Sequence, residues 1–186
     1  MGEGVRCSWV NLKNKKYVCY HDEEWGRTEH DDQKLYGLLI LESFQAGLSW
    51  ECVLNKREHF RVAYDGFDID KVIWYDEEKR QALLSDPGII RNRLKVKASI
   101  KNSVIFKAIQ KEYGSFDRYI WSFTDRQVIY EPFTLWVTSP LSDQISKDLK
   151  KRGMTFVGST IIYSYLQAIG VINGHAEDCM CRHPAP

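Results

Sequence analysis

Capping residues and glycines divide the chain into helical segments, and this division constrains the fold more than any other feature. The longest segment, residues 92–113, has helical periodicity and is followed by Gly114, which is placed to end it. Another begins at a cap, Asp31 or Asp32, and is expected to stop at Gly47. Further helices are expected in WECVLNKREHFRVAY, KVIWY, DEEKRQALL, SFDRYIWSF, LSDQISKDLKK and GSTIIYSYLQAIG. Because strand patterns do not recur, the sequence predicts an all-α fold.

Two local features refine this expectation. The segment QVIYEPFTLWV is rich in strand-forming residues, but Pro132 within it favours a loop or an extended strap. Ser142 is expected to cap the helix in LSDQISKDLKK, and Gly153 is expected to end that helix. Both expectations concern residues that precede GSTIIYSYLQAIG, the last strong helical segment of the chain.

The length of 186 residues suits one domain, 1–186, built as two helical lobes that share a core. No apolar run approaches the length of a membrane span, and the N-terminus has no apolar signal core. We therefore expect a cytoplasmic protein with no membrane partner. The net charge of +1 favours no partner by itself.

Basic residues are distributed unevenly along this nearly neutral chain. Residues 87–111 contain seven Lys or Arg and no acid, and residues 150–152 form a second basic cluster. One such run alone is more typical of a solvated helix face. Two runs beside glycine-containing turns favour phosphate contacts, which we expect from residues 91–101.

A possible anion-binding turn lies in LKKRGMTFVGSTIIYSYLQAIG, residues 149–170. Gly153 and Gly158 allow the backbone to approach a ligand closely, and the following helix presents the N–H groups of Ser159 and Thr160. This pattern resembles a helix-hairpin-helix, which grips a DNA phosphate through backbone amides. The alternative is an ordinary tight connection between two packed helices.

Glu42 interrupts an apolar helical stripe that otherwise contains Leu35, Leu38, Leu39 and Ala46. A carboxylate on such a face is costly unless it is hydrogen-bonded or paired. One alternative is an ion pair or a position at the edge of the stripe, and the other is a pocket carboxylate that meets a ligand.

Cysteines and histidines near the two ends of the chain can form a metal site. Cys7 and His21 form one pair, and His175 and Cys179 form another, with a spacing that corresponds to one helical turn. Together they make a Cys₂His₂ set, which is typical of closed tetrahedral zinc. The alternative is a buried thiol and a frayed C-terminal tail. The five cysteines are odd in number, which argues against a disulfide framework.

His21-Asp22-Glu23 also has the H-x-E pattern of zinc-dependent nucleobase deaminases. That interpretation fails because the second cysteine pair is C-x-C rather than C-x-x-C. No proline precedes the pair, and it lies more than about 150 residues downstream of His21, outside the deaminase signature.

Several motifs occur together and in order along the chain. They are Cys7-Ser8-Trp9, Tyr20-His21-Asp22-Glu23-Glu24-Trp25-Gly26, Leu41-Glu42-Ser43, Gln45-Ala46-Gly47-Leu48-Ser49-Trp50, Gly88-Ile89-Ile90-Arg91, Lys151-Arg152-Gly153 and Phe156-Val157-Gly158. In this arrangement the chain closely resembles the DNA-3-methyladenine glycosylase I family of bacterial base-excision repair enzymes. The resemblance extends from RCSWV at the start to HAEDCMC at the end.

The resemblance implies an all-helical fold with a helix-hairpin-helix and a structural zinc that joins the N- and C-terminal segments. It implies hydrolysis of the N-glycosidic bond of 3-methyladenine in alkylated double-stranded DNA, without backbone cleavage, by a monomeric protein. The zinc ligands would be Cys7, His21, His175 and Cys179. The base pocket would contain Trp9, Tyr17, Tyr20, Trp25, Glu42 and Trp50.

If the chain acts as this resemblance implies, Glu42 is the candidate catalytic residue. It is expected to act mainly by recognising the base and by electrostatic stabilisation. The turn from Gln45 to Leu48 is expected to place a wedge in the duplex. Asp178 is expected to belong to the zinc region, beside Cys179, rather than to the chemistry. The competing function is a silent binder of alkylated DNA that uses the same pocket without releasing a base.

Overall fold

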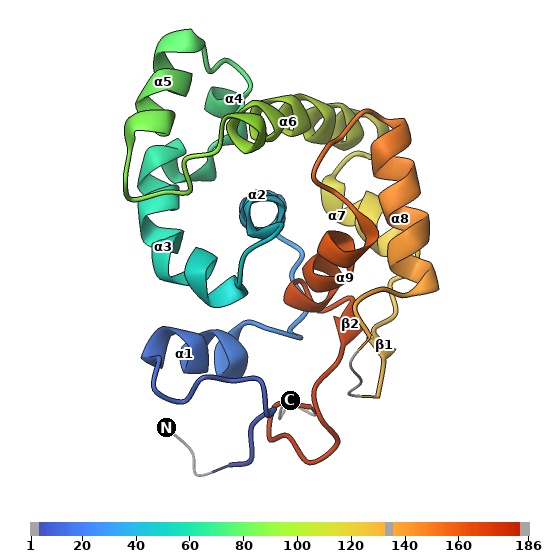
Figure 1. The fold of residues 1–186 in the computed structure, drawn as a ribbon. Helices are drawn as coiled ribbons and strands as arrows, with labels where there is room; N and C mark the ends of the chain where they lie inside the picture. The colour runs from blue at the N-terminus through green and yellow to red at the C-terminus, as the bar shows by residue number, and fades with distance from the viewer. Residues whose placement is uncertain (1–3, 133–135, 183–186) are drawn as a thin grey trace.

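The computed structural model describes residues 4–132 and 136–182, and this part of the chain is mostly helical (Figure 1). The elements in chain order are α1 Lys15–Glu23, α2 Asp32–Gln45, α3 Trp50–Ala63, a 3₁₀ turn Asp65–Phe67, α4 Ile69–Val72, α5 Glu77–Ser85, α6 Arg93–Tyr113, α7 Phe116–Ser122, β1 Ile129–Tyr130, α8 Pro140–Lys151, α9 Ser159–Ala168 and β2 Ile172–Asn173. Among these described helices, none is both long and apolar enough to span a lipid bilayer.

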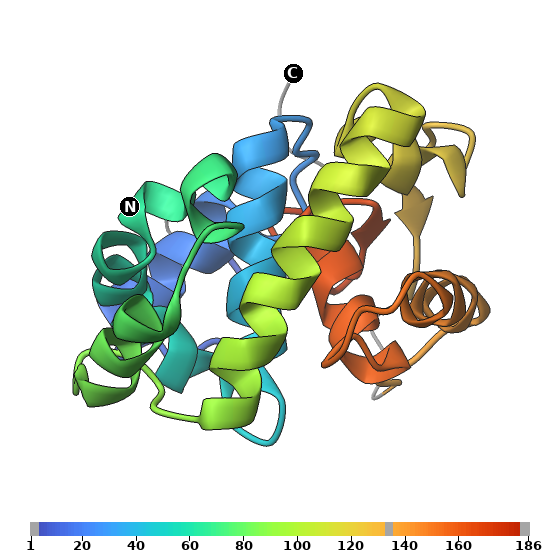
Figure 2. The ribbon, with the colours of Figure 1, turned by 90° about the horizontal axis from the view of Figure 1, so that it is seen from above.

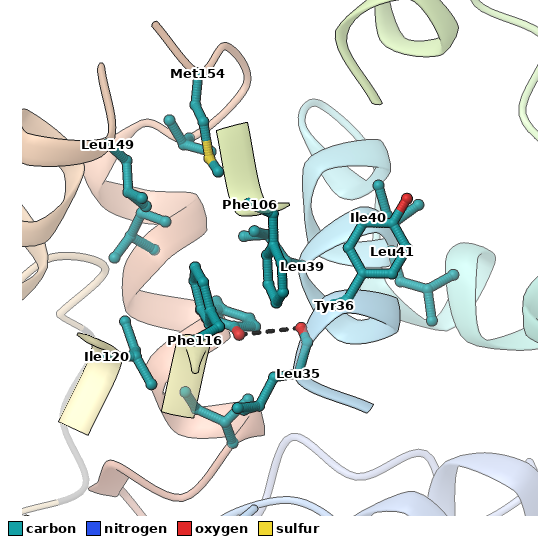
Figure 3. Packing of buried hydrophobic residues seen from close by; sticks show 14 of the residues in the cluster. Leu35, Tyr36, Leu39, Ile40, Leu41, Phe106, Phe116, Ile120, Leu149 and Met154 are labelled. Atoms are coloured by element: carbon teal, nitrogen blue, oxygen red, sulfur yellow. Dashed lines mark hydrogen bonds between the residues drawn. The ribbon is translucent and has the colours of Figure 1, made fainter. Parts of the chain in front are cut away.

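Helix α2 is the centre of the core, and Figure 1 shows it end-on with α3, α6 and α9 around it. Its residues are buried on nearly every side, as expected for a helix that neighbours surround. Leu35 and Leu39 pack with Phe106 of α6 and Phe116 of α7 in the main cluster (Figure 3). Position 42 is therefore fixed on a rigid and enclosed element.

The helix boundaries follow the local capping chemistry. Asp31 caps α2 by accepting from the N–H of Lys34, and Asn92 caps α6 by accepting from two N–H groups of its first turn. Gly114 ends α6 at φ +85°, a left-handed conformation that glycine adopts without strain. These expected boundaries are confirmed. Helix α1, which Asn14 caps, was not among the expected helices.

The cap expected at Ser142 is wrong, because α8 begins at Pro140 and its N-cap is Ser139. The Ser139 side chain accepts from the N–H of Ser142, and the Ser142 hydroxyl accepts from the N–H of Ser139. Ser142 is therefore the reciprocal member of a capping box. Proline at the first helical position has the φ that the helix requires.

The segment around Pro132 was predicted to be a loop or an extended strap, and its first part forms the short strand β1, which pairs in parallel with β2. Residues 133–135 of the strap lie outside the described residues. The two strands have two residues each, so they change the helical class of the fold little. Their pairing joins the strap to the segment that follows α9.

The two ends of the described chain lie side by side below the helical core (Figure 1). The N–H of Met180 donates to the carbonyl of Val5 at 2.9 Å, which joins the terminal segments directly. A second buried cluster, separate from the main core, contains residues of both segments, including Cys7 and Cys179. The fold thus brings together residues more than 150 positions apart.

Candidate functional site

A cavity of about 430 Å³ lies between α1, the C-terminal end of α2, the strap and α9. All of the residues expected to form the pocket line it: Trp9, Tyr17, Tyr20, Trp25, Glu42 and Trp50. The size and the mixture of rings with a few polar groups are typical of a small-molecule site. Gln45 and Thr160, expected near DNA, also line this cavity.

Aromatic rings form two groups in the cavity wall. Trp9 contacts Trp25 edge-on, with ring centroids 4.9 Å apart, and Tyr17 with centroids 5.4 Å apart. Tyr20 and Trp50 form the other pair, at 5.2 Å. Rings held in this way present flat faces and edges to a planar ligand.

Glu42 is 2% exposed, and its Oε2 atom has no hydrogen-bond partner among the described residues. Burial raises the pKa of its carboxyl group to about 8. No ion pair with Glu42 is found in the described chain, so the ion-pair alternative fails. A buried carboxyl without a partner is costly, and a ligand that offers a donor or positive charge would offset that cost.

Two further buried polar atoms of the cavity residues lack partners in the described structure. They are the side-chain oxygen of Gln45 and the indole nitrogen of Trp50. With Glu42, the cavity residues carry two unused acceptors and one unused donor. Unsatisfied polar atoms are rare in protein interiors, so their concentration here indicates a ligand site.

The sequence reasoning missed the contribution of α9 to the cavity wall. Thr160, Tyr163, Ser164 and Gln167 all line the cavity. Their spacing of i, i+3, i+4 and i+7 places them on one helical face. A polar stripe within the otherwise apolar STIIYSYLQA was the available signal. The hairpin helix is therefore also a wall of the pocket.

The turn from Gln45 to Leu48 borders the cavity. The N–H of Leu48 donates to the carbonyl of Gln45 at 2.7 Å. Ala46 has φ −45° and ψ 115°, and Gly47 has φ +78°, which together make a type II turn. Glycine suits that third position, because its φ is positive. The turn leaves Leu48 41% exposed, and it begins at Gln45, which lines the cavity.

The expected phosphate-binding hairpin has the geometry of a helix-turn-helix connection. Gly153 has φ +100°, and Gly158 is the N-cap of α9 without a side chain to satisfy the first N–H groups. The Ser159 hydroxyl hydrogen-bonds that of Ser142 at 2.8 Å, which leaves its backbone N–H as the group available to an anion. Of the adjacent basic cluster, Arg152 pairs with Glu112 and Asp148 rather than extending freely.

Cys7, His21, His175 and Cys179 are all buried, and one ligand atom of each lies within 4.8 Å of the others. This group could hold one metal ion. The prediction that His175 and Cys179 lie one helical turn apart is wrong, because both residues lie outside the helices of the structure. A non-helical turn brings their Nδ1 and Sγ atoms to 3.4 Å.

The remaining nitrogen of each of these histidines is hydrogen-bonded, which fixes the ring orientation. His175 Nε2 donates to the Trp25 carbonyl at 3.0 Å, and His21 Nδ1 donates to Asp22 at 2.8 Å. Asp22 in turn accepts hydrogen bonds from Nε and Nη2 of Arg6. Outer partners of this kind orient metal-binding histidines. Sequence reasoning assigned no role to Asp22.

Glu23 and Glu24, the two acids that follow Asp22, also have hydrogen-bond partners. Glu24 forms a bidentate pair with Arg57, and Glu23 accepts from the exposed Cys19 thiol. Asp178 is exposed, lies beside Cys179 and does not line the cavity. These positions agree with the interpretation that Asp178 belongs to the metal region.

Comparison with known proteins places this geometry in context. A family described as methyladenine glycosylase matches residues 9–183. The chain is 42% identical over 180 residues to "DNA-3-methyladenine glycosylase 1" of Escherichia coli strain K12, covering 95% of this chain and 96% of that protein.

Two solved structures share the fold over nearly the whole chain. A crystal structure of 3-methyladenine DNA glycosylase I matches with a TM-score of 0.91 and 42% identity, covering 97% of this chain and 100% of that one. The Staphylococcus aureus 3-methyladenine DNA glycosylase I, in a structure on 3-methyladenine recognition, matches with a TM-score of 0.92 and 30% identity over 100% of both chains.

Proposed function

This chain belongs to the methyladenine glycosylase family, and from that premise we propose that it removes 3-methyladenine from alkylated double-stranded DNA. It hydrolyses the N-glycosidic bond and releases the base without cutting the backbone. The observation that carries this proposal is the buried Glu42 carboxyl, unpaired with any described residue and enclosed by aromatic rings. Such a site matches a flat, cationic ligand.

The damaged nucleotide must leave the base stack to reach the cavity. Methylation at N3 gives the adenine a positive charge, and the rings of Tyr20, Trp25 and Trp50 then attract it. Each good cation–π contact contributes about 0.5–2 kcal/mol. An undamaged adenine is neutral and lacks this cation–π attraction. The positive charge therefore distinguishes the methylated base from normal adenine.

Glu42 supports both recognition and bond cleavage. Before a base is bound, the raised pKa of Glu42 favours the protonated acid at neutral pH. A cationic base beside the carboxyl stabilises its ionised form, which accepts a hydrogen bond from the exocyclic amine. The bond to the sugar is already labile, because the base departs as a neutral molecule. Water then attacks the sugar carbon as positive charge develops there, and the nearby carboxylate stabilises that charge.

The DNA contacts come from two sides of the cavity. Leu48, exposed on its glycine-containing turn, enters the space that the extruded base leaves. The backbone N–H groups of Ser159 and Thr160 at the start of α9 bind a phosphate beside the cavity. Exposed Arg91 and Arg93, immediately before and at the start of α6, add phosphate contacts.

The buried Cys/His group fits zinc. Tetrahedral zinc with its usual bond lengths places nitrogen and sulfur ligands about 3.6 Å apart. His175 Nδ1 lies 3.5 Å from Cys7 Sγ and 3.4 Å from Cys179 Sγ, and His21 Nε2 lies 3.5 Å from Cys179 Sγ. Four protein ligands leave no open position for water, so zinc here supplies stability rather than chemistry.

The decisive experiment is incubation of the purified monomeric protein with methylated duplex DNA, followed by chromatography of the released bases. Free 3-methyladenine in amounts that grow with time supports the enzyme. Tight binding of methylated DNA without release would identify a silent damage binder and overturn the proposal. An intact DNA backbone, before any treatment that cleaves abasic sites, separates hydrolysis from lyase activity.

A further inference from the structure

Lys95 lies in the first turn of α6, but its side chain is buried rather than solvated. The residue is 7% exposed, and its Nζ donates to the carbonyl of Phe44 at 2.8 Å and to that of Ala46 at 2.6 Å. Figure 2 shows the start of α6 beside the turn that follows α2. Its burial removes Lys95 from the phosphate-binding surface expected of residues 91–101.

The two bonds complete the hydrogen bonding of three consecutive carbonyl groups. Lys95 satisfies the carbonyls of residues 44 and 46, and the N–H of Leu48 satisfies that of Gln45 between them. Carbonyl groups at the end of a helix lack intrahelical partners, and a cation there also interacts favourably with the helix dipole. Lys95 therefore holds both the last turn of α2 and the type II turn beyond it.

We propose that Lys95 is a positioning residue that fixes the turn from Gln45 to Leu48 against the N-terminal end of α6. This inference rests on the proposed function, because it concerns how the wedge residue is presented to DNA. Among the described residues, the two Lys95 bonds are the hydrogen bonds found between α6 and this end of α2, and Gly47 within the turn is exposed. Without Lys95 the carbonyls of residues 44 and 46 would lose their donor, and the turn would rearrange.

The position of Lys95 also couples two expected DNA contacts. Arg91 and Arg93 lie just before it in the chain and are exposed, and Leu48 lies on the turn that it holds. Lys95 thus links the segment that carries Arg91 and Arg93 to the turn that carries Leu48. A side chain that positions a reacting group by a fraction of an ångström has a large effect on rate without touching the substrate.

The test compares Lys95→Met with Lys111→Met, an exposed lysine of the same helix about 24 Å away along its axis. Release of 3-methyladenine from methylated duplex under single-turnover conditions should fall by about 10- to 100-fold in Lys95→Met. Affinity for free 3-methyladenine, which needs the pocket but no duplex opening, should fall much less than release, because only Gln45 of the turn lines the cavity. Lys111→Met should leave both measurements unchanged, and Lys95→Arg, which restores a charged donor, should recover part of the release.

The salt dependence of duplex binding separates positioning from a phosphate contact. The slope of log affinity against log salt should be unchanged in Lys95→Met, whereas a lost phosphate contact would reduce it by about one. Unchanged release, an equal loss of release and base affinity, or a reduced slope would each overturn the proposal. If Lys95→Met does not fold, Lys95→Gln serves in the same comparison. Wild-type release is measured first, so failure of the proposed function is recognised separately.

Discussion

The proposed metal cluster, formed by Cys7, His21, His175 and Cys179, and the cavity both contain buried polar atoms, but they differ in how completely these atoms are hydrogen-bonded. In the metal cluster the outward nitrogens of His21 and His175 have partners at 2.8 and 3.0 Å. In the cavity, polar side-chain atoms of Glu42, Gln45 and Trp50 have none in the described structure. The two regions touch, since the ring centroids of Trp25 and His175 are 4.5 Å apart.

This difference distinguishes a site built for stability from one built for a ligand. Satisfied polar groups stabilise the fold, whereas unsatisfied ones cost stability until a ligand supplies the missing partner. Changes in the metal cluster should therefore act on folding first and on activity second. Changes at the cavity should act on activity while stability stays the same or increases.

Loss of the proposed zinc should produce the largest effect. Cys179→Ser removes one of the four ligands, and we expect the melting temperature to fall by about 10 °C or more. Structural zinc supplies many kcal/mol in small domains, and each kcal/mol corresponds to about 2–4 °C in a chain of this size. Metal analysis together with thermal unfolding provides the measurement, and a chelator should act on wild-type protein in the same direction.

Cys181→Ser is the discriminating comparison, because Cys181 is also buried and lies two residues away. It is outside the four-residue group but forms a second candidate group with His21 and Asp22. It should retain one zinc per chain and nearly the wild-type melting temperature. Undamaged wild-type protein without any metal would refute the zinc assignment. Equal losses in the two serine variants would point to a different ligand set.

The next largest effect should be a pH dependence of the free energy of unfolding, caused by the Glu42 carboxyl group in the cavity. Glu42 has a pKa of about 8 in the folded protein, against 4.5 when exposed in the unfolded chain. Its contribution to the free energy of unfolding is therefore complete below about pH 4.5 and is lost as the pH rises through about 8. A difference of this size corresponds to at most about 5 kcal/mol.

Glu42→Gln isolates this contribution, because the titration of the metal ligands is common to both proteins. Unfolding should be measured from pH 5 to pH 9 with zinc present. The stability of wild type relative to the variant should decline across this range and become constant above about pH 8. Parallel profiles would show that Glu42 does not titrate abnormally.

The same substitution should reduce base release. An amide keeps the size of the side chain but cannot supply the negative charge, and hydrogen bonds to charged groups contribute about 1.5–3 kcal/mol. Release of 3-methyladenine should therefore fall by about 10- to 100-fold, with a melting temperature equal to or above that of wild type. Glu58→Gln, an exposed change of the same kind on α3, should leave both unchanged. If Glu42→Gln lost stability but kept the wild-type rate of base release, Glu42 would serve the fold rather than the ligand, which contradicts the comparison.

Local chemistry made the helices predictable from the sequence. Asp31, Asn92 and Gly114 act within one turn of their own positions, so their roles follow from residue type. Ser142 was misplaced because Ser139 and Pro140 offered an equally local cap three residues earlier. The six expected pocket residues line one cavity, and the four expected metal ligands lie together. The full pocket set came from the family resemblance, whereas residue types and spacing already indicated the metal set.

The residues that were missed depend on packing between distant segments. Asp22 orients His21 only because Arg6 lies beside it, and Lys95 is buried only because α6 crosses the end of α2. The polar face of α9 lines the cavity because of how α9 packs on α2. Sequence periodicity predicts that a helix has a polar face but does not say what that face contacts.

Asp22→Asn should give the smallest effect, confined to the metal cluster. The amide can still accept from His21 Nδ1 but loses the charge that Arg6 and the histidine ring complement. Loss of such an outer partner typically weakens metal binding about 10- to 100-fold. Zinc competition with a chelator should show this shift, and Glu23→Gln, an exposed neighbouring change, should not. At saturating zinc the release of 3-methyladenine should equal that of wild type. A reduced rate under those conditions would mean that the cluster does more than hold the Trp25 side of the cavity in place, and the separation between the two regions would fail.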